Sequence, residues 1–319
     1  ISQVQRMFEI KRYEPSHEQA WNDFVARSKN GTFLFDRRFM DYHSDRFADS
    51  SLMILRKGRI YALLPANRVG DTLHSHQGLT YGGLLTDAKA TAEGVMEAFG
   101  ALNAWLRNEG VRRVTYKAMP WIYHRLPAEE DLYALTQVCH ARLLTREISS
   151  TILLQQPLRF TESRKSGLRK ALREGLYMEE SGDLAAFWQM LDDNLASRHH
   201  THPVHSLDEL RLLQGRFPQQ IHLYLIYNKE KEPVGGTWVF DTGQVVHTQY
   251  IASTEEGKAH GALDLLFDEL INRRYREGIY LDFGKSTEEG GRVLNEHLIF
   301  QKEGFGGRGV CYDTYEWEP

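Results

Sequence analysis

The chain has 319 residues, enough for two domains of ordinary size, and its 41% hydrophobic and 26% charged content is typical of a soluble globular protein. Its formal net charge of −4 excludes a global basic field for nucleic acid, although local basic patches stay compatible with it. The only two cysteines, Cys139 and Cys311, exclude a disulfide scaffold, and no apolar run is long enough to span a bilayer, so we expect a cytoplasmic protein.

The first half of the chain carries an α/β pattern. In order, the periodicities predict a strand at 7–13, a helix from Ser16 through Trp21 and Val25, a hairpin of 52–55 and 59–66 around Lys57-Gly58, a glycine-rich segment at 74–83, a helix ending at Gly110 and a strand at 111–117. Hydrophobic residues at Val95, Phe99, Leu102 and Leu106 give that last helix its buried face.

The second half continues this pattern after Pro157. A basic helix is predicted first, with Leu168 and Leu172 on its buried side. The further predictions are a helix through Phe187 and Leu195, a helix at 207–217 capped by Ser206, a hairpin at 223–240, a strand at 245–251, a polar turn at 253–261, a helix stopped by Gly278, a strand at 279–283, a loop at 284–291 and a helix through Val293, Leu294, Leu298 and Ile299.

One arrangement occurs in both halves: hairpin, glycine-bearing turn, helix, glycine, strand. Placing Gly110 on Gly278 brings the two copies into register, which predicts an internal duplication of one α/β unit, although two unrelated α/β units would show the same periodicity. We therefore expect an α/β (α+β) protein with two domains, residues 1–150 and 151–319, each a mixed central sheet flanked by helices.

The strand, turn and helix from Gln244 onward form a unit that presents backbone N–H groups and a positive helix end to an anion. Gly257, Lys258 and Gly261 in this turn are candidate ligand-binding residues. The alternative interpretation is a glycine-tolerant turn that caps a core helix.

Several segments, in order along most of the chain, resemble the FemAB-like peptidyltransferases, which are tandem members of the GNAT acyltransferase superfamily. The segments are Ser75–Gly83, Met119–His124, Gly167–Ala171, Pro203–Ser206, Tyr280–Gly284 and Lys302–Gly306. The usual acetyltransferase signature, Gln/Arg-x-x-Gly-x-Gly/Ala, is represented here only by Lys258-x-x-Gly261-x-Leu263.

The resemblance implies two GNAT-like domains and transfer of an acyl or aminoacyl group to an amine, as on a peptidoglycan precursor or an amino sugar. It implies acyl-CoA or aminoacyl-tRNA as co-substrate, with no tightly bound cofactor. The net charge and the lack of a long apolar run predict no DNA partner and no integral membrane segment. Typical members carry a coiled-coil arm for tRNA. This sequence has no long heptad stretch and a net negative charge, which argues against tRNA as the donor, although the donor's identity is not fixed by the sequence.

Three residues are candidate catalytic groups. Lys302 matches a family position that contacts the reacting groups, where its ammonium could stabilise charge on a carbonyl oxygen. Asp282 ends a strand next to Gly284, where α/β sheets place ligands, and could orient an amine or act as a base. His205 lies in the Pro203–Ser206 match and titrates near neutrality. The alternatives are a lysine at a helix end, a turn cap and a polar loop.

The remaining candidates would bind substrate. They are Arg169 and Lys170 on the basic helix, Lys285 and Phe305 near the second glycine loop, and His76, Tyr81 and Tyr123 in the first half. A solvated helix face and buried aromatic packing are the respective alternatives. The histidines at 199, 200, 202 and 205 fit no metal-binding spacing, so we expect no metal site.

Two other functions compete with a FemAB-like N-acyltransferase. One is an acetyl-CoA-dependent N-acetyltransferase of a small amine. The other is a non-catalytic GNAT-fold binding module, which the incomplete signature at 258–263 favours.

Overall fold

The computed structural model describes residues 7–199 and 202–319, which form two compact units. Of these residues, unit 1 contains 7–147, 289–292 and 311–319, and unit 2 contains 148–199, 202–288 and 293–310. The chain passes from one unit to the other within β8 (Arg142–Leu153), before and after residues 289–292, and within β16 (Arg308–Trp317). Each unit therefore includes segments that are distant in sequence.

Unit 1 is built from helices and from strands of two sheets. Its further elements are β1 (Phe8–Arg12), η2 (Pro15–His17), α1 (Glu18–Arg27), η3 (Phe33–Phe35), α2 (Arg37–Met40), η4 (Asp41–His43), β2 (Leu52–Arg56), β3 (Arg59–Leu64), β4 (Asn67–Val69), β5 (Thr72–Ser75), β6 (Leu85–Thr86), α3 (Ala92–Asn108), β7 (Arg113–Lys117), η5 (Trp121–Tyr123), α4 (Glu130–Gln137) and η7 (Glu289–Gly291). One sheet has the order β1-β2-β3-β6, and the other strands of the unit follow the order β4-β5-β7-β16.

The predicted hairpin of β2 and β3 is confirmed. Lys57 and Gly58 both have positive φ, 52° and 74°, as the tight turns favoured in hairpins require. Helix α3 begins at the predicted hydrophobic stripe, where the side chain of Thr91 caps it. Its Phe99 and Leu102 share one buried core with Ile54 of β2 and Val114 of β7.

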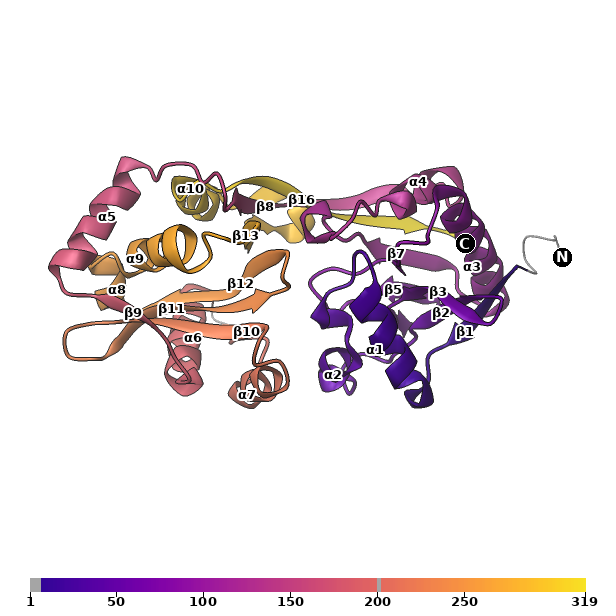
Figure 1. Ribbon diagram of the computed structural model, residues 1–319, viewed down its shortest axis with the longest axis horizontal. Helices are drawn as coiled ribbons and strands as arrows, with labels where there is room; N and C mark the ends of the chain where they lie inside the picture. Colours follow the sequence, from indigo (N-terminus) through magenta and orange to yellow (C-terminus); the bar gives the residue numbers. More distant parts are fainter. Residues whose placement is uncertain (1–6, 200–201) are drawn as a thin grey trace. The chain divides into compact units, whose positions relative to one another are not determined.

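Unit 2 has a single main sheet with the order β8-β13-β12-β11-β10-β9. Its elements after β8 are α5 (Glu162–Arg173), β9 (Tyr177–Glu180), α6 (Leu184–His199), α7 (Leu207–Arg216), β10 (Ile221–Tyr227), β11 (Pro233–Asp241), β12 (Val245–Ser253), α8 (Glu255–Ala259), α9 (Ala262–Glu269), η6 (Leu270–Arg274), β13 (Tyr280–Lys285), β14 (Thr287–Glu288), β15 (Val293–Leu294) and α10 (Glu296–Gly304). Helices α5 and α9 lie on one side of this sheet and α6 and α7 on the other (Figure 1).

The two units repeat one strand pattern. In unit 1, β4 pairs antiparallel with β5, β5 pairs parallel with β7 across α3, and β7 pairs antiparallel with β16. In unit 2, β11 pairs antiparallel with β12, β12 pairs parallel with β13 across α9, and β13 pairs antiparallel with β8. The expected α/β fold is confirmed: each unit has mixed strands flanked by helices, although these strands of both units belong to one ten-stranded sheet.

Three local predictions differ from the structure. Val293 and Leu294 do not belong to the predicted helix: they form β15, which pairs with β14, and α10 begins only after Asn295, whose side chain caps it. Leu172 is 60% exposed, because Ala171 takes the buried position on α5. The predicted turn at 253–261 contains the short helix α8, capped by Thr254.

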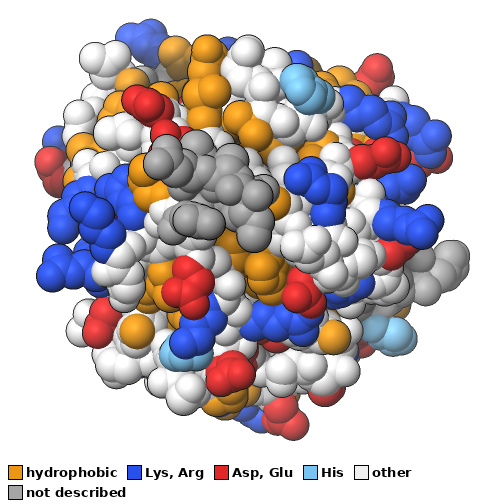
Figure 2. Space-filling model, turned by 90° about the vertical axis from the view of Figure 1, so that its right-hand side faces the viewer, with side chains coloured by type: hydrophobic (Ala, Val, Ile, Leu, Met, Phe, Trp, Pro, Cys, Tyr) orange, Lys and Arg blue, Asp and Glu red, His pale blue; other side chains and the backbone are white. Residues whose placement is uncertain are grey.

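The surface shows no single dominant charge on the face that Figure 2 presents, where Lys and Arg side chains are interspersed with Asp and Glu side chains among the residues drawn in colour. This agrees with the net charge of −4. Within residues 7–199 and 202–319, every helix is too short or too polar to cross a membrane.

Candidate functional site

The strands β12 and β13 of unit 2 separate after a short parallel contact. Their pairing comprises Val245 with Tyr280, Val246 with Leu281, and His247 with Asp282. Both strands continue beyond this point, β12 to Ser253 and β13 to Lys285. We call the place where the pairing ends the fork. Because backbone groups beyond the fork have lost that ladder partner, polar groups of a ligand could bind between these strands.

Asp282 lies at the fork and is completely buried. Its Oδ1 accepts hydrogen bonds from Ser149 Oγ, from Thr151 Oγ1 at 3.4 Å and from the backbone N–H of Gly284 at 3.1 Å. Three donors on one carboxylate oxygen favour the ionised form and fix its orientation. The buried carboxylate therefore points in one direction before any substrate binds.

His247 faces the other oxygen of this carboxylate. Its Nδ1 lies 3.7 Å from Asp282 Oδ2, and 9% of its side chain is exposed. Gly284 has a φ of 84°, and a Cβ there would lie 3.3 Å from His247 Cε1, so a larger residue would press on the ring. The fork thus holds a carboxylate and an imidazole side by side.

Lys302 is buried on α10 and reaches the end of β13. Its Nζ donates to the carbonyl oxygens of Gly284 and Lys285, each at 3.2 Å, and to Ser286 Oγ at 2.9 Å. Burial lowers the Lys302 pKa to about 8, and the charge of Asp282 opposes this shift. An ammonium has three donors, so a substrate oxygen would have to replace one of these partners.

The other two candidates near β13 differ in exposure. The side chain of Lys285 is exposed, and only its backbone oxygen meets Lys302. Phe305 is buried, with its ring centroid 5.0 Å from that of Phe267 and 5.8 Å from that of Phe283. Phe305 therefore packs in the core that supports Lys302.

The turn before α9 is filled by the chain itself. The backbone N–H of Gly257 donates to Thr254 Oγ1, and Lys258 pairs with Glu255 at 3.1 Å. Gly261 has a φ of 75°, and a Cβ there would overlap the backbone oxygen of Gly167 on α5. These contacts fit the helix-capping interpretation of the turn.

An acidic residue, Asp264, occupies the first turn of α9. It is buried, and burial raises its pKa to about 6, whereas the charge of Arg164 lowers it. Arg164 Nη1 lies 3.0 Å from Asp264 Oδ1, yet the pair lacks hydrogen-bond alignment. The carboxylate of Asp264 therefore lies at the positive end of α9, where an anionic ligand was predicted to bind.

The basic residues of α5 point to solvent. Arg169 and Lys170 are exposed, and Arg169 Nη2 contacts Glu162 Oε1 at 2.5 Å. An exposed pair of this kind adds little to stability. The structure places these two side chains on the outer face of α5, while its Gly167 packs against the turn before α9.

His205 belongs to an aromatic cluster beside β12. Its Nδ1 lies 2.5 Å from the hydroxyl of Tyr250, and its backbone oxygen accepts from Trp188 Nε1 at 3.0 Å. Its ring meets that of Trp238 at 6.2 Å. Burial raises the Tyr250 pKa to about 12, so this hydroxyl stays protonated near neutral pH.

His200 lies outside the described residues. Among the described ones, no three His, Cys, Asp or Glu side chains are placed to hold a metal ion.

The candidates of unit 1 are buried. Tyr81 and Tyr123 have ring centroids 4.6 Å apart, and their hydroxyls meet those of Thr32 and Tyr312, each at 3.1 Å. Their burial, 2% and 1% exposed, favours the packing alternative.

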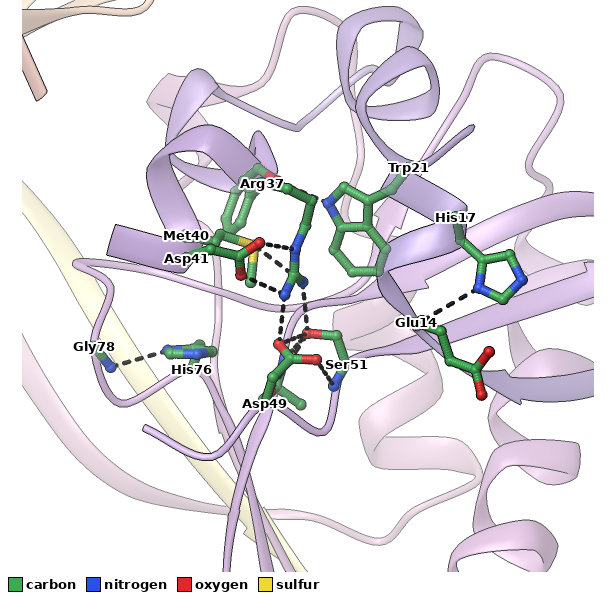
Figure 3. Close-up of polar contacts among 12 residues, drawn as sticks. Glu14, His17, Trp21, Arg37, Met40, Asp41, Asp49, Ser51, His76 and Gly78 are labelled. Atoms are coloured by element: carbon green, nitrogen blue, oxygen red, sulfur yellow. Dashed lines mark hydrogen bonds and ion pairs between the residues drawn. The ribbon is translucent and has the colours of Figure 1, made fainter. Parts of the chain in front are cut away.

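His76 is also buried, and its Nδ1 accepts from the N–H of Gly78 at 3.0 Å (Figure 3). Its ring stacks on that of His43 with centroids 5.6 Å apart. Burial, together with the charge of His43, lowers the His76 pKa to about 3. This histidine is therefore neutral near pH 7.

Figure 3 also shows a buried arginine in the same unit. Arg37 of α2 is 2% exposed and lies 2.6 Å from Asp41 Oδ1 and 2.9 Å from Asp49 Oδ1. Its guanidinium also lies over the ring of Trp21, 5.1 Å from the centroid. This cluster ties α2 to the segment before β2.

Sequence reasoning did not single out His247, Ser149 or Thr151. The two parallel strands begin at Val245 and Tyr280, so His247 and Asp282 are each the third residue of their strand. Counting in register from these two starts could have paired them. Ser149 and Thr151 alternate within the polar run Ser149–Thr151 of β8, but only the antiparallel register places them beside Asp282.

Comparison with known proteins extends this geometry. Residues 161–290 match the family model described as "Acetyltransferase (GNAT) domain". No curated protein matches the sequence.

Among solved structures, FemX is similar with a TM-score of 0.66 at 11% identity, covering 98% of this chain and 97% of that one. L-PGS from Bacillus licheniformis is similar with a TM-score of 0.62 at 12% identity, covering 95% and 91%. A tandem GNAT protein from the clavulanic acid biosynthesis pathway has a TM-score of 0.50 at 12% identity, covering 98% of each chain.

These similarities extend over nearly the whole chain, and the matched family model falls on unit 2, which contains the fork, except for residues 289 and 290. The chain therefore shares the fold of FemX and of the tandem GNAT protein, and its residues 161–290 match a GNAT acetyltransferase domain.

Proposed function

We propose that this protein is a FemAB-like N-acyltransferase that transfers an acyl or aminoacyl group to a primary amine at the fork of unit 2. The observation that carries this proposal is the polar cluster of Asp282, His247 and Lys302 where β12 and β13 separate. Burying polar and charged groups costs free energy, and such buried groups gather at functional sites. The match of residues 161–290 to a GNAT acetyltransferase domain supports acyl transfer in this unit.

The reaction needs no covalent intermediate on the protein. The amine nitrogen attacks the carbonyl carbon of a bound ester or thioester, and the bond from that carbon to oxygen or sulfur then breaks. The amine loses one proton, and the leaving oxygen or sulfur gains one. Groups that fix the carbonyl and take the proton accelerate both steps.

In this scheme Lys302 would act where its side chain meets the end of β13. Its ammonium holds the carbonyl groups of Gly284 and Lys285, and its positive charge lies close enough to Asp282 for their charges to interact. A substrate carbonyl that replaced one of its partners would gain a charged donor in a buried setting.

The donor is best tested as a choice between two classes. The turn before α9 is closed by Gly167, and the first turn of α9 bears the buried Asp264. A pyrophosphate placed there would meet a carboxylate, which supports an aminoacyl ester over acyl-CoA held at this turn.

The acceptor we favour is an amine on a peptidoglycan precursor or an amino sugar. The fold shared with FemX supports the first of these classes. A small-molecule amine with acetyl-CoA is the second candidate, supported by the family model, whose description names acetyltransferases.

The test combines two donors with a panel of acceptors. Purified protein is incubated with acetyl-CoA or with a mixture of aminoacyl-tRNAs, and with a nucleotide-linked muropeptide, glucosamine or a small diamine. Mass spectrometry of the acceptor detects an added acyl or aminoacyl group. We expect transfer from at least one donor, and we expect Asp282→Asn and Lys302→Met each to slow it at least tenfold.

Transfer from acetyl-CoA alone to a small amine would select the second candidate. Full activity of both variants would show that the fork takes no part in the reaction. Binding of the muropeptide with no turnover from any donor would identify a non-catalytic module.

A further inference from the structure

His247 carries an unusual buried nitrogen. Its Nδ1 is inaccessible to solvent and has no hydrogen-bond partner in the part of the chain that the structure describes. Such nitrogens are nearly always paired in folded proteins, because burial removes their hydrogen bonds to water. This one stands 3.7 Å from Asp282 Oδ2, just beyond hydrogen-bonding distance, in a register that places the two residues side by side.

The carboxylate determines how the imidazole is protonated. Oδ1 of Asp282 is held by Ser149, Thr151 and the N–H of Gly284, so Oδ2 is oriented toward the ring. An ionised carboxylate attracts an N–H and repels a lone pair, so the neutral ring carries its proton on Nδ1. Nε2 then bears the basic lone pair.

A substrate could meet His247 only through the part of its side chain that stays exposed. Nδ1 is buried, so the 9% of the side chain that remains exposed belongs to the rest of the residue. A shift of a few tenths of an ångström would close the Nδ1 to Oδ2 distance to a hydrogen bond, as catalytic contacts commonly do when substrate binds.

The neighbouring elements place both charged and neutral groups near this ring. Asp282 on β13 faces it directly, and Lys302 on α10 lies close enough to Asp282 to interact with it. The neighbouring strand β11 places the apolar Phe240 in register with His247, and β8 contributes the neutral Ser149 and Thr151.

We propose that His247 is the catalytic residue that accepts the proton of the attacking amine, with Asp282 as its positioning residue. This inference rests on the function proposed above. The amine nitrogen forms its bond to the carbonyl carbon and gives its proton to Nε2. The imidazolium, stabilised by Asp282, then gives that proton to the oxygen or sulfur as its bond to carbon breaks. Atoms and charge balance without a further reactant.

The first experiment measures transfer with the donor and acceptor pair that the screen above identifies. The variant His247→Gln keeps a polar side chain and removes the base, and we expect kcat to fall 10²- to 10⁴-fold with KM for the acceptor nearly unchanged. The matched control is His222→Gln, because His222 of β10 belongs to the same unit and bonds to Glu180 and to the Gln219 backbone. The control should retain wild-type kcat.

The pH profile separates catalysis from a loss of structure. For wild type, kcat/KM should fall in acid as a single basic group becomes protonated, and Asp282→Asn should change this profile because it removes the carboxylate that faces the ring. A purely structural role of His247 would leave the profile as it is when Asp282 is changed.

A second measurement needs no substrate. Two-bond ¹H–¹⁵N spectra of the histidine rings, assigned with His247→Asn, report which nitrogen carries the proton, and we expect Nδ1. A ring protonated on Nε2 at neutral pH would overturn the proposal, as would His247→Gln with wild-type kcat in an active enzyme. Absence of transfer by the wild type from either donor would instead overturn the proposed function, and this inference with it.

Discussion

At the scale of single residues, Lys302 shows how burial and hydrogen bonding oppose each other. Desolvation disfavours its ammonium and lowers its pKa to about 8, whereas three acceptors and the charge of Asp282 retain the proton. The balance leaves a lysine that is charged at neutral pH and close to its titration range. A group in this condition responds to small changes in its surroundings.

This balance predicts how stability changes in alkaline solution. The folded pKa of about 8 lies below the unfolded value near 10.5, so between these values the unfolded chain binds more protons. The free energy of unfolding contributed by this group therefore rises from pH 7.5 to 9.5, by about 2 kcal/mol. We expect urea midpoints to show this rise for the wild type relative to Lys302→Met.

The control for this measurement is Lys170→Met, because Lys170 is exposed on α5. It should follow the wild type across this range. Parallel curves for the wild type and Lys302→Met would show that the lysine is not desolvated.

The burial of His76 predicts how stability changes in acidic solution. Its folded pKa of about 3 lies below the ordinary value near 6.5, so in mild acid the unfolded chain takes a proton that the folded chain refuses. Stability from this group is complete above pH 6.5 and is lost as pH falls toward 3. From pH 7 to 5 we expect a loss of about 2 kcal/mol.

The variant His76→Gln should lack this part of the acid loss, which urea unfolding at pH 7 and pH 5 would measure. Equal losses in wild type and variant would mean that the ring reaches water. The comparison isolates His76 because buried acids such as Asp131, whose pKa burial raises to about 6, are common to both proteins.

At the scale of elements, the contact between α5 and the start of α9 depends on two glycines, Gly167 and Gly261. A Cβ at Gly167 would overlap Asp264 Oδ2, and one at Gly261 would overlap the backbone oxygen of Gly167. The two segments approach more closely than any larger residue permits. This approach closes the turn that the GNAT signature would open to a phosphate.

Gly167→Ala should therefore destabilise the protein by about 1–3 kcal/mol, because overpacking exceeds the gain in helix propensity. The matched control is Gly215→Ala on α7, where no atom lies within 4 Å of the added Cβ. That control should be neutral or more stable by up to about 1 kcal/mol. Melting temperatures of both variants test the pair, and a stabilising Gly167→Ala would contradict the close approach.

Periodicity predicted most of these elements and failed where local pairing decides. The hairpin at Lys57-Gly58 was readable because its turn needs positive φ at both positions. Leu294 has helical spacing to Leu298, yet Asn295 caps α10 after Leu294, and Val293 and Leu294 pair with β14. Competition between a cap and a two-residue ladder is not visible in hydrophobic spacing.

The candidate site was predictable only in part for a related reason. Asp282 was found because it ends a strand beside glycine, and Lys302 because of a family resemblance. Ser149 lies 133 positions from its partner Asp282, and no periodicity links two strands so far apart. The importance of His247 follows from an unpaired buried atom, which only coordinates reveal.

At the scale of the whole molecule, the repeated strand pattern is completed by different parts of the chain. In unit 2, β13 pairs antiparallel with β8, which comes earlier in the sequence. The corresponding strand beside β7 in unit 1 is the end of β16, the last strand of the chain. Unit 1 therefore cannot complete its sheet until the C-terminal residues are available.

This arrangement predicts a selective effect of truncation. Ending the chain at Val310 removes the residues that pair with β7, including Trp317, which is buried in the core of α3 and donates from Nε1 to Asn103 at 2.9 Å. Loss of this tryptophan alone costs about 3–5 kcal/mol, since Trp317→Ala leaves a large cavity. We expect hydrogen exchange to become fast in α3 and β7 while the strands of unit 2 keep their protection.

The milder variant Trp317→Ala should show the same regional pattern with smaller amplitude. Removal of Glu318 and Pro319 only, beyond the end of β16, is the control and should leave exchange unchanged. Fast exchange confined to β10 and β11 of unit 2 would contradict the assignment of the C-terminal strand to unit 1. Because the fork belongs to unit 2, its ligand binding should survive the milder variant, which separates folding of one unit from chemistry in the other.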